Sequence, residues 1–232
     1  MPFYPFYPVN LRINNRLCVI VGGGAVALRK VRGLLEAKAQ IRVISPNVAM
    51  ELRILSDTGK IEWLRRGYVE GDLQCAFLVF AATNDRGVQL RIKSEAAKLG
   101  CILNSADDPG GSDFHVPAHF RRGKMLIAIS TGGGSPALAK KIREQLENTI
   151  GPEYEAVVDL LGLIREKLLE GPDEVVMHTE LFRRLLHIGV VDLLLEANWF
   201  ELQMLLLREL PKEIDAVALV RQFLEKHDTP RL

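Results

Sequence analysis

A glycine pattern near the N-terminus carries the strongest chemical signal in this sequence. Gly22, Gly24 and Ala27 fit the spacing G-x-G-x-x-G/A. The first glycine permits a tight turn, the second lets the backbone approach a pyrophosphate, and a small third residue lets a helix pack closely on a strand. Free N–H groups and the positive end of the helix dipole would face the phosphates. The pattern predicts a dinucleotide site; the alternative is a glycine-rich turn without a ligand.

The segments on either side of the glycines supply the context that this chemistry needs. An apolar run over 17–21 predicts a buried strand, and apolar residues at helical spacing over 25–37 predict a helix. A strand, a glycine turn and a helix in this order make the pattern far more specific than the spacing alone. The predicted phosphate contacts are Gly22, Gly23, Gly24, Ala25 and Val26.

A second predicted strand, over 40–44, would deliver residues to the ribose end of the same site. The usual fingerprint has an acidic residue at the end of this strand, where it binds the ribose hydroxyls. Here neither an acid nor an evident arginine separates NAD from NADP. The residues expected at the ribose are Ser45, Pro46 and Asn47.

A third segment, the apolar run 77–82, predicts a central parallel strand. Ligands of open α/β sheets lie beyond the carboxyl ends of such strands. Asp85, with the residue before it, is equally suited to capping the next predicted helix, over 86–99, and both roles are compatible. The residues expected to line the cofactor are Ala82, Thr83 and Asn84.

The strands and helices alternate up to about residue 113, which predicts an α/β fold with a Rossmann-type, doubly wound parallel sheet. Beyond it the pattern predicts a small α+β region and then only helices. Strands over 114–118 and 124–130 would flank a basic turn at 121–123, a helix would follow over 137–146, and three or four helices would fill the remainder. The predicted domains are 1–113, 114–150 and 151–232.

Composition excludes several classes of protein. The 232 residues are 48% hydrophobic and 25% charged, and the net charge of +1 gives no reason to expect a nucleic-acid partner. The spacing of Cys18, Cys75 and Cys101 suits reduced thiols better than disulfides or a metal site. The chain has no apolar run long enough for a membrane span and no secretory signal pattern, so a cytoplasmic protein is expected.

Several motifs occur together and in a characteristic order. They are V-I-V-G-G-G-x-V-A-x-R-K at 19–30, L-L-E-A at 34–37, A-A-T-N-D at 81–85, N-x-x-D-x-P at 104–109, F-x-x-P-A at 114–118 and I-S-T-G-G-x-S-P-A-L-A at 129–139. Over about residues 5–150 the chain thereby resembles the precorrin-2 dehydrogenase and sirohydrochlorin ferrochelatase family of sirohaem synthesis. The remaining residues match only in being helical.

The resemblance implies oxidation of precorrin-2 to sirohydrochlorin with NAD⁺ as hydride acceptor. It leaves open whether Fe²⁺ is then inserted to give sirohaem. It also implies a homodimer, with 114–150 as the dimerisation and substrate region. Because no methyltransferase domain is recognised, a separate uroporphyrinogen-III methyltransferase is the expected supplier of precorrin-2. The role of the helical tail stays open.

The resemblance assigns catalysis to Asp107, as the general base that accepts the proton released with the hydride. On the residues alone, Asp-Asp-Pro-Gly-Gly is also an ordinary turn sequence. Asp108 stands where many family members have a small residue, and a second carboxylate there would raise the pKa of Asp107 or substitute for it.

The implied substrate carries many carboxylates, so cations and N–H-rich loops are expected around it. For the basic residues, a solvated charged face is the alternative. His115 and His119 are separated by Pro117 and no zinc-type cluster is evident, so no stable metal site is expected and iron would be a substrate. The residues expected at the substrate are Asn104, Arg121, Thr131, Gly132, Gly133 and Ser135.

A hypothesis from a different class is a non-catalytic dinucleotide-sensing or assembly protein on the same fold. Its features would be a basic helix pair or a blocked crevice. The nearly neutral charge and the motif around Asp107 count against it.

Overall fold

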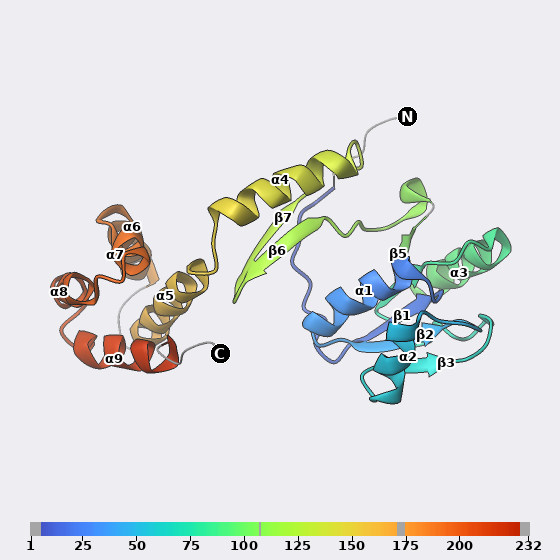
Figure 1. Ribbon diagram of the computed structural model, residues 1–232, viewed down its shortest axis with the longest axis horizontal. Coiled ribbons are helices and arrows are strands. Elements are labelled where there is room, and N and C mark those ends of the chain that lie inside the picture. The colour runs from blue at the N-terminus through green and yellow to red at the C-terminus, as the bar shows by residue number, and fades with distance from the viewer. Residues whose placement is uncertain (1–5, 107, 171–174, 228–232) are drawn as a thin grey trace. The chain divides into compact units, whose positions relative to one another are not determined.

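The computed structural model describes residues 6–106, 108–170 and 175–227. The chain divides into two compact units, Met1–Val116 and Pro117–Leu232 (Figure 1). Within the described residues, no helix is both long and apolar enough to cross a bilayer.

The first unit is built on a five-stranded sheet in which every neighbouring pair is parallel, as predicted. The strand order is β3-β2-β1-β4-β5, so the order reverses between β1 and β4. In open α/β sheets this reversal is where ligands bind. The strands are β1 Leu17–Val21, β2 Gln40–Ile44, β3 Glu62–Leu64, β4 Leu78–Ala81 and β5 Ile102–Ser105.

Helices cover both faces of this sheet. Val31 of α1 and Leu52 of α2 pack with Ile20 in one buried cluster, whereas Ile92 of α3 packs with Val19 in the other. Successive strand residues point to opposite faces, which explains why neighbours on β1 belong to different clusters. The helices are α1 Ala25–Glu36, α2 Met50–Asp57 and α3 Arg86–Leu99, with a short 3₁₀ turn, η1, at Pro109–Gly111.

A buried carboxylate fixes the loop between β3 and β4 against α3. Glu95 is 4% exposed and accepts hydrogen bonds from the N–H of Gly71 at 3.0 Å, the N–H of Leu73 at 3.1 Å and the hydroxyl of Tyr68. Burial, reinforced by the Glu95 carboxylate, raises the pKa of Tyr68. The Tyr68 hydroxyl therefore stays protonated at neutral pH, and its hydrogen bond to Glu95 helps to anchor the loop.

All three cysteines are unpaired thiols, which agrees with the sequence prediction. Cys18 and Cys101 are buried and Cys75 is exposed. Burial raises the pKa of Cys18 to about 11, so this thiol stays protonated and unreactive at neutral pH.

The second unit begins with an antiparallel hairpin, β6 Ala118–Arg122 and β7 Met125–Ile129. The predicted first strand at 114–118 and the basic turn at 121–123 were wrong. Pro117 has no N–H to donate to a ladder, and Gly123 at φ +54° supplies the left-handed conformation of the turn. Arg121 and Arg122 therefore lie in the strand rather than at its tip.

Helix α4, Pro136–Thr149, follows the hairpin, and five further helices are present in the described residues of the unit. One more helix is present than the largest number predicted, because the leucine-rich run breaks at Ala197 (φ +53°) and Asn198, whose side chain caps α8. Leu160, Leu206 and Phe223 form the centre of a core confined to these helices. They are α5 Tyr154–Leu169, α6 Val175–His187, α7 Val190–Leu195, α8 Trp199–Glu209 and α9 Ala216–His227.

Asp159 connects three elements of this unit. Its side chain is 8% exposed and accepts from Lys226 Nζ of α9 at 2.6 Å. Lys124 Nζ of the hairpin turn lies at 3.8 Å and His227 Nε2 at 3.3 Å. Burial acts to raise the pKa of Asp159, but Lys226, Lys124 and His227 together outweigh it and hold that pKa below its ordinary value.

Candidate functional site

Three loops meet at the carboxyl edge of the sheet, at the point where the strand order reverses. The N–H of Gly22 donates to the carbonyl of Ile44 at 2.9 Å, and the N–H of Ala82 donates to that of Val21 at 2.8 Å. The N–H of Ala49 donates to the carbonyl of Gly23 at 2.8 Å. The ends of β1, β2 and β4 are thus held together by main-chain hydrogen bonds.

Gly22 and Gly23 are required by close backbone contacts. Gly22 has φ +130°, and a Cβ there would lie 2.1 Å from the carbonyl oxygen of Ala82. A Cβ on Gly23 would lie 2.1 Å from the carbonyl oxygen of Asn47. Both glycines therefore allow the loops to approach one another, and the predicted cofactor residues of all three loops lie in one place.

Gly24 has the opposite environment. It is the N-cap of α1, it provides no side-chain cap, and a Cβ built on it meets no atom within 4 Å. The first-turn N–H groups of a helix have no partner within the helix. Gly24 and Ala25 are exposed and Val26 is half-buried, so α1 presents these donors at an open position suited to a phosphate.

The loop after β2 is closed by its own contacts. Ser45 is 9% exposed; its Oγ donates to the carbonyl of Asn47 at 2.6 Å, and its own carbonyl accepts from Trp63 Nε1 at 2.9 Å. The hydroxyl is therefore engaged, whereas Pro46 and Asn47 are exposed.

The loop after β4 leads directly into α3. The Nε2 of Gln89 donates to the carbonyl of Thr83 at 2.6 Å, and the Oγ1 of Thr83 accepts from the N–H of Asp85 at 3.2 Å. Asp85 caps α3 by accepting from the N–H of Val88 at 3.0 Å, as the sequence indicated. Ala82 and Thr83 are half-buried and Asn84 is exposed.

Asp107, the predicted base, lies outside the described residues. Its neighbour Asp108 accepts from Lys93 Nζ at 3.2 Å and from the N–H of Gly111 at 2.9 Å. The hydrogen bond and charge of Lys93 hold the pKa of Asp108 below its ordinary value. Asn104, which is 8% exposed, donates from Nδ2 to the carbonyl of Phe114 at 2.9 Å, so its side chain organises the chain after η1.

The other predicted substrate residues lie in the second unit. Arg121 is exposed on β6. The Oγ1 of Thr131 bonds to both the N–H and the carbonyl of Ser135 at 3.1 Å, and the Oγ of Ser135 accepts from the N–H of Leu138. These hydroxyls thus close the loop before α4. Gly132 and Gly133 adopt φ of +62° and +86° within it.

Two basic residues near the sheet of the first unit, Lys30 and Arg65, were not predicted as site residues from the sequence. Lys30 of α1 is half-buried, its ammonium lies 5.4 Å from the centroid of the Phe80 ring, and burial lowers its pKa to about 8. Arg65 follows β3, which pairs in parallel with β2, so it leaves the sheet at the same edge as Ser45. The sequence predicts a strand over 61–64 that ends just before Arg65. The pairing of this strand with β2, which places Arg65 beside the site, could not be predicted from the sequence.

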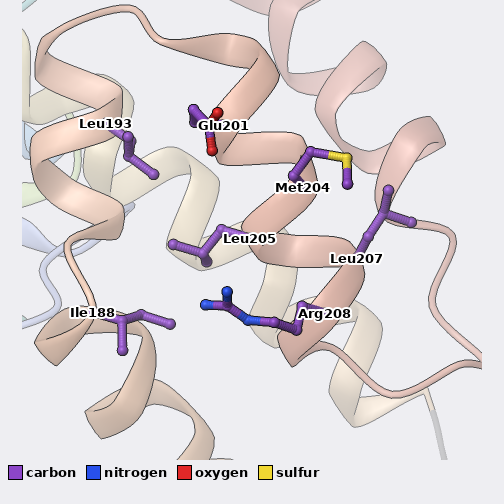
Figure 2. A pocket seen from close by; sticks show the side chains of 7 residues that line it. All are labelled: Ile188, Leu193, Glu201, Met204, Leu205, Leu207 and Arg208. Carbon is purple, nitrogen blue, oxygen red and sulfur yellow. The ribbon is translucent and has the colours of Figure 1, made fainter.

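A surface hollow of about 620 Å³ in the second unit contains none of the predicted site residues (Figure 2). Figure 2 shows that it is lined mostly by apolar side chains, with Glu201 and Arg208 among them. Among the described residues, no three His, Cys, Asp or Glu side chains gather as metal ligands. The residues lining the hollow are Ile188, Leu193, Glu201, Met204, Leu205, Leu207 and Arg208.

Two family profiles match consecutive parts of the chain. Residues 9–118 match the family described as putative NAD(P)-binding, and residues 122–149 match the family described as sirohaem biosynthesis protein central. The chain therefore resembles, over most of its length, the NAD(P)-binding and central parts of sirohaem biosynthesis proteins. It therefore contains an NAD(P)-binding domain, as its glycine pattern predicted.

Two siroheme synthases are similar to this chain over much of its length. Siroheme synthase 3 of Aeromonas hydrophila subsp. hydrophila is 37% identical over 163 residues, which is 70% of this chain and 35% of that protein. The siroheme synthase of Thioalkalivibrio sulfidiphilus is 36% identical over 194 residues, 83% of this chain and 40% of that protein. The aligned region thus spans well under half the length of these curated relatives.

One solved structure has a similar architecture along almost its whole length. The structure named SirC, precorrin-2 dehydrogenase, superposes with a TM-score of 0.70 at 26% identity, covering 96% of this chain and 99% of that one. The structural match includes the C-terminal helices, whereas the sequence motifs lie within about residues 5–150.

Proposed function

We propose that this protein is an NAD-dependent precorrin-2 dehydrogenase that forms sirohydrochlorin in sirohaem biosynthesis. The observation that carries the proposal is the main-chain phosphate cradle at Gly22–Val26, at the reversal of strand order, in a chain similar to a solved structure named a precorrin-2 dehydrogenase. NAD⁺ bound at this edge supplies the hydride acceptor.

The chain's own residues would divide the remaining work. The first turn of α1 holds the pyrophosphate through N–H groups. Gly22 and Gly23 keep the three loops in contact, and the loop at Ala82–Asn84 lines the cofactor beyond β4. This division needs no ionised side chain at the phosphates, which suits a cofactor that must be released after each turnover.

Asp107 would accept the proton that leaves the macrocycle along with the hydride. Its neighbour Asp108 is a poor second base because Lys93 and the N–H of Gly111 already occupy its carboxylate. The described contacts of Asp108 favour a structural role, so we assign the proton transfer to Asp107 alone.

The substrate's carboxylates would meet Arg121 and the N–H-rich loop Thr131–Ser135, together with Asn104. We further propose a homodimer formed through 114–150. A uroporphyrinogen-III methyltransferase activity would supply the precorrin-2. Insertion of Fe²⁺ as a second substrate is supported by the name siroheme synthase carried by the relatives.

An anaerobic absorbance assay with precorrin-2 and NAD⁺ tests the proposal. We expect the sirohydrochlorin spectrum only when NAD⁺ is present, and a further protein-dependent change when Fe²⁺ or Co²⁺ is added. Asp107→Asn should lower turnover by about 100-fold or more with unchanged NAD⁺ affinity. The matched control Asp108→Asn should keep turnover within about threefold.

Three other outcomes would change this assignment. Full activity of Asp107→Asn would remove Asp107 from the mechanism. Equal losses in both variants would make the two carboxylates act together. NAD⁺ binding without any turnover of precorrin-2 would favour the non-catalytic dinucleotide-sensing protein instead.

A further inference from the structure

The adenosine end of the nucleotide site lacks the carboxylate that normally selects NAD⁺. The loop that follows β2 begins with Ser45, Pro46 and Asn47. The nearest carboxylate on the neighbouring strand, Glu62, is paired with Arg42 at 2.7 Å. An acid at the end of β2 binds the ribose 2′-hydroxyl and repels a 2′-phosphate. Neither effect operates here.

A cation stands at this edge instead. Leu64 is the register partner of Ile44, and its carbonyl accepts from the N–H of Ser45 at 3.2 Å. Ser45 and Arg65 are therefore the first residues after the paired ends of the adjacent strands β2 and β3. Parallel strands end at the same edge, so these two residues face the same ligand space.

Trp63 connects the arginine to the ribose loop. Its Nε1 donates to the carbonyl of Ser45 at 2.9 Å, and the guanidinium carbon of Arg65 lies 5.7 Å from its ring centroid. An arginine over an indole face is held in a preferred position while its N–H groups stay available. The stacking thus places a cation beside the loop that would hold the ribose.

The positive charge of Arg65 is not neutralised within the described part of the chain. Its side chain is exposed and no ion pair joins it to a described carboxylate. The next residue differs: Arg66 is bound by both oxygens of Asp72, at 2.6 and 2.7 Å, and belongs to the anchored loop. Of these two adjacent arginines, only Arg65 has its charge available for an anion.

We propose that Arg65 binds the 2′-phosphate of NADP⁺, so that this site accepts NADP⁺ as well as NAD⁺. Guanidinium matches phosphate geometry and stays charged at every relevant pH. Exposed Asn47 would add a neutral donor rather than a repelling acid. The inference rests on the proposed nucleotide site and adds the residue that sets its specificity.

Calorimetric titration of the full-length protein tests this directly, without turnover. NADP⁺ is expected to bind within about threefold of NAD⁺, and 2′,5′-ADP more tightly than 5′-AMP. Arg65→Gln should weaken NADP⁺ and 2′,5′-ADP by about tenfold and leave NAD⁺ and 5′-AMP within twofold, since only the former carry the 2′-phosphate. Arg53→Gln, an exposed arginine of α2, is the matched control and should change neither.

A second variant tests the same inference by adding a negative charge near the ribose instead of removing the positive charge of Arg65. Asn47→Asp, at an exposed position, introduces a carboxylate near the ribose and should raise the Kd for NADP⁺ about tenfold relative to the Kd for NAD⁺. Circular dichroism of each variant confirms that it is folded.

The outcomes separate this inference from the function on which it rests. NAD⁺ binding at least tenfold tighter than NADP⁺ in the unmodified protein, or an equal effect of Arg65→Gln on both nucleotides, would overturn the role of Arg65 and leave the dehydrogenase intact. Absence of binding by either nucleotide would instead overturn the nucleotide site itself.

Discussion

Gly22 and Gly24 lie two residues apart, yet an added methyl group meets very different surroundings at each. At Gly22 it would lie 2.1 Å from the carbonyl oxygen of Ala82, in a backbone conformation that only glycine readily adopts. At Gly24 it would meet no protein atom within 4 Å. One glycine therefore serves the fold and the other serves the ligand.

Alanine substitutions should separate these roles. Gly22→Ala is expected to lower the free energy of unfolding by about 2 kcal/mol or more because the loops must move apart. Gly24→Ala should change stability by only about 0.5 kcal/mol but weaken NAD⁺ about tenfold, since the methyl group enters the phosphate space. Urea unfolding and calorimetry measure the two effects. NAD⁺ affinity unchanged by Gly24→Ala would mean that this residue does not face the pyrophosphate.

Lys30 predicts a pH dependence of stability. Burial lowers the pKa of Lys30 to about 8 in the folded protein, whereas the pKa of a lysine in an unfolded chain is about 10.4. Between these two pH values the unfolded chain therefore binds a proton that the native chain does not. Stability should therefore rise with pH across that interval, by roughly 2–3 kcal/mol. Lys30→Met should abolish this rise.

The measurement for Lys30 is urea unfolding at pH 7, 8, 9 and 10. Lys60→Met, at an exposed position, is the matched control and should keep the rise. A parallel slope in Lys30→Met and the unmodified protein would show that another group causes it.

At the residue scale, the sequence predicts the glycines well because their spacing is a local requirement of one turn. Arg65 could not be predicted in the same way. Its nearness to Ser45 depends on β3 pairing with β2, a contact between segments twenty residues apart. The local pattern of apolar residues predicts that a segment forms a strand, but it does not predict which other strand will pair with it.

Among the elements, α5, α9 and the hairpin turn depend on one carboxylate. Asp159→Asn removes the charge that pairs with Lys226, Lys124 and His227 and is expected to lower the free energy of unfolding by about 2 kcal/mol at pH 7. Asp57→Asn, whose exposed carboxylate lies 3.9 Å from Arg53, should cost less than about 0.5 kcal/mol. Equal effects in the two variants would contradict the role of Asp159.

The same carboxylate predicts a response to acid. Because its cationic partners hold the pKa of Asp159 below the ordinary value, its stabilisation is present above the unfolded pKa of about 3.9 and is lost as the pH falls through the folded pKa. The difference in unfolding free energy between the unmodified protein and Asp159→Asn should therefore shrink below about pH 4.

Element boundaries were predicted well where residues force them and poorly elsewhere. Asp85 and Ser135 cap α3 and α4, and both starts were correct to one residue. The leucine-rich run 193–207 reads as one continuous apolar stretch, so its break at Ala197 was missed. Apolar spacing describes which face of a helix is buried, but it does not reveal where one helix stops and another begins.

For the whole molecule, each unit has its own hydrophobic core. The cores of the first unit draw on residues 13–103 and that of the second on residues 157–223. The parallel sheet was predictable because α1, α2 and α3 separate most of its successive strands. The sequence predicts domain boundaries after residues 113 and 150, and the chain divides into its two compact units between residues 116 and 117.

Separate cores predict separate effects of core mutations. Leu206→Ala, at a fully buried position in the second unit, is expected to lower the free energy of unfolding of that unit by 2–5 kcal/mol, yet leave the Kd for NAD⁺ within twofold at 10 °C. Ile20→Ala, fully buried on β1, should lower stability similarly and also weaken NAD⁺. Calorimetric melting and titration measure both. A large loss of NAD⁺ affinity in Leu206→Ala would show that the units are energetically coupled.

The phosphate cradle at Gly22–Val26 also determines which amino-acid substitutions this site tolerates. Recognition there is made by main-chain N–H groups, which every amino acid except proline retains. A saturation library should therefore show sharp intolerance at Gly22 and Gly23, where any side chain collides with a neighbouring loop, and broad acceptance of small residues at Ala25, which is exposed. Substitution in this loop would be limited by the space for a side chain rather than by side-chain chemistry, so Ala25 could change without loss of the ligand whereas Gly22 and Gly23 could not.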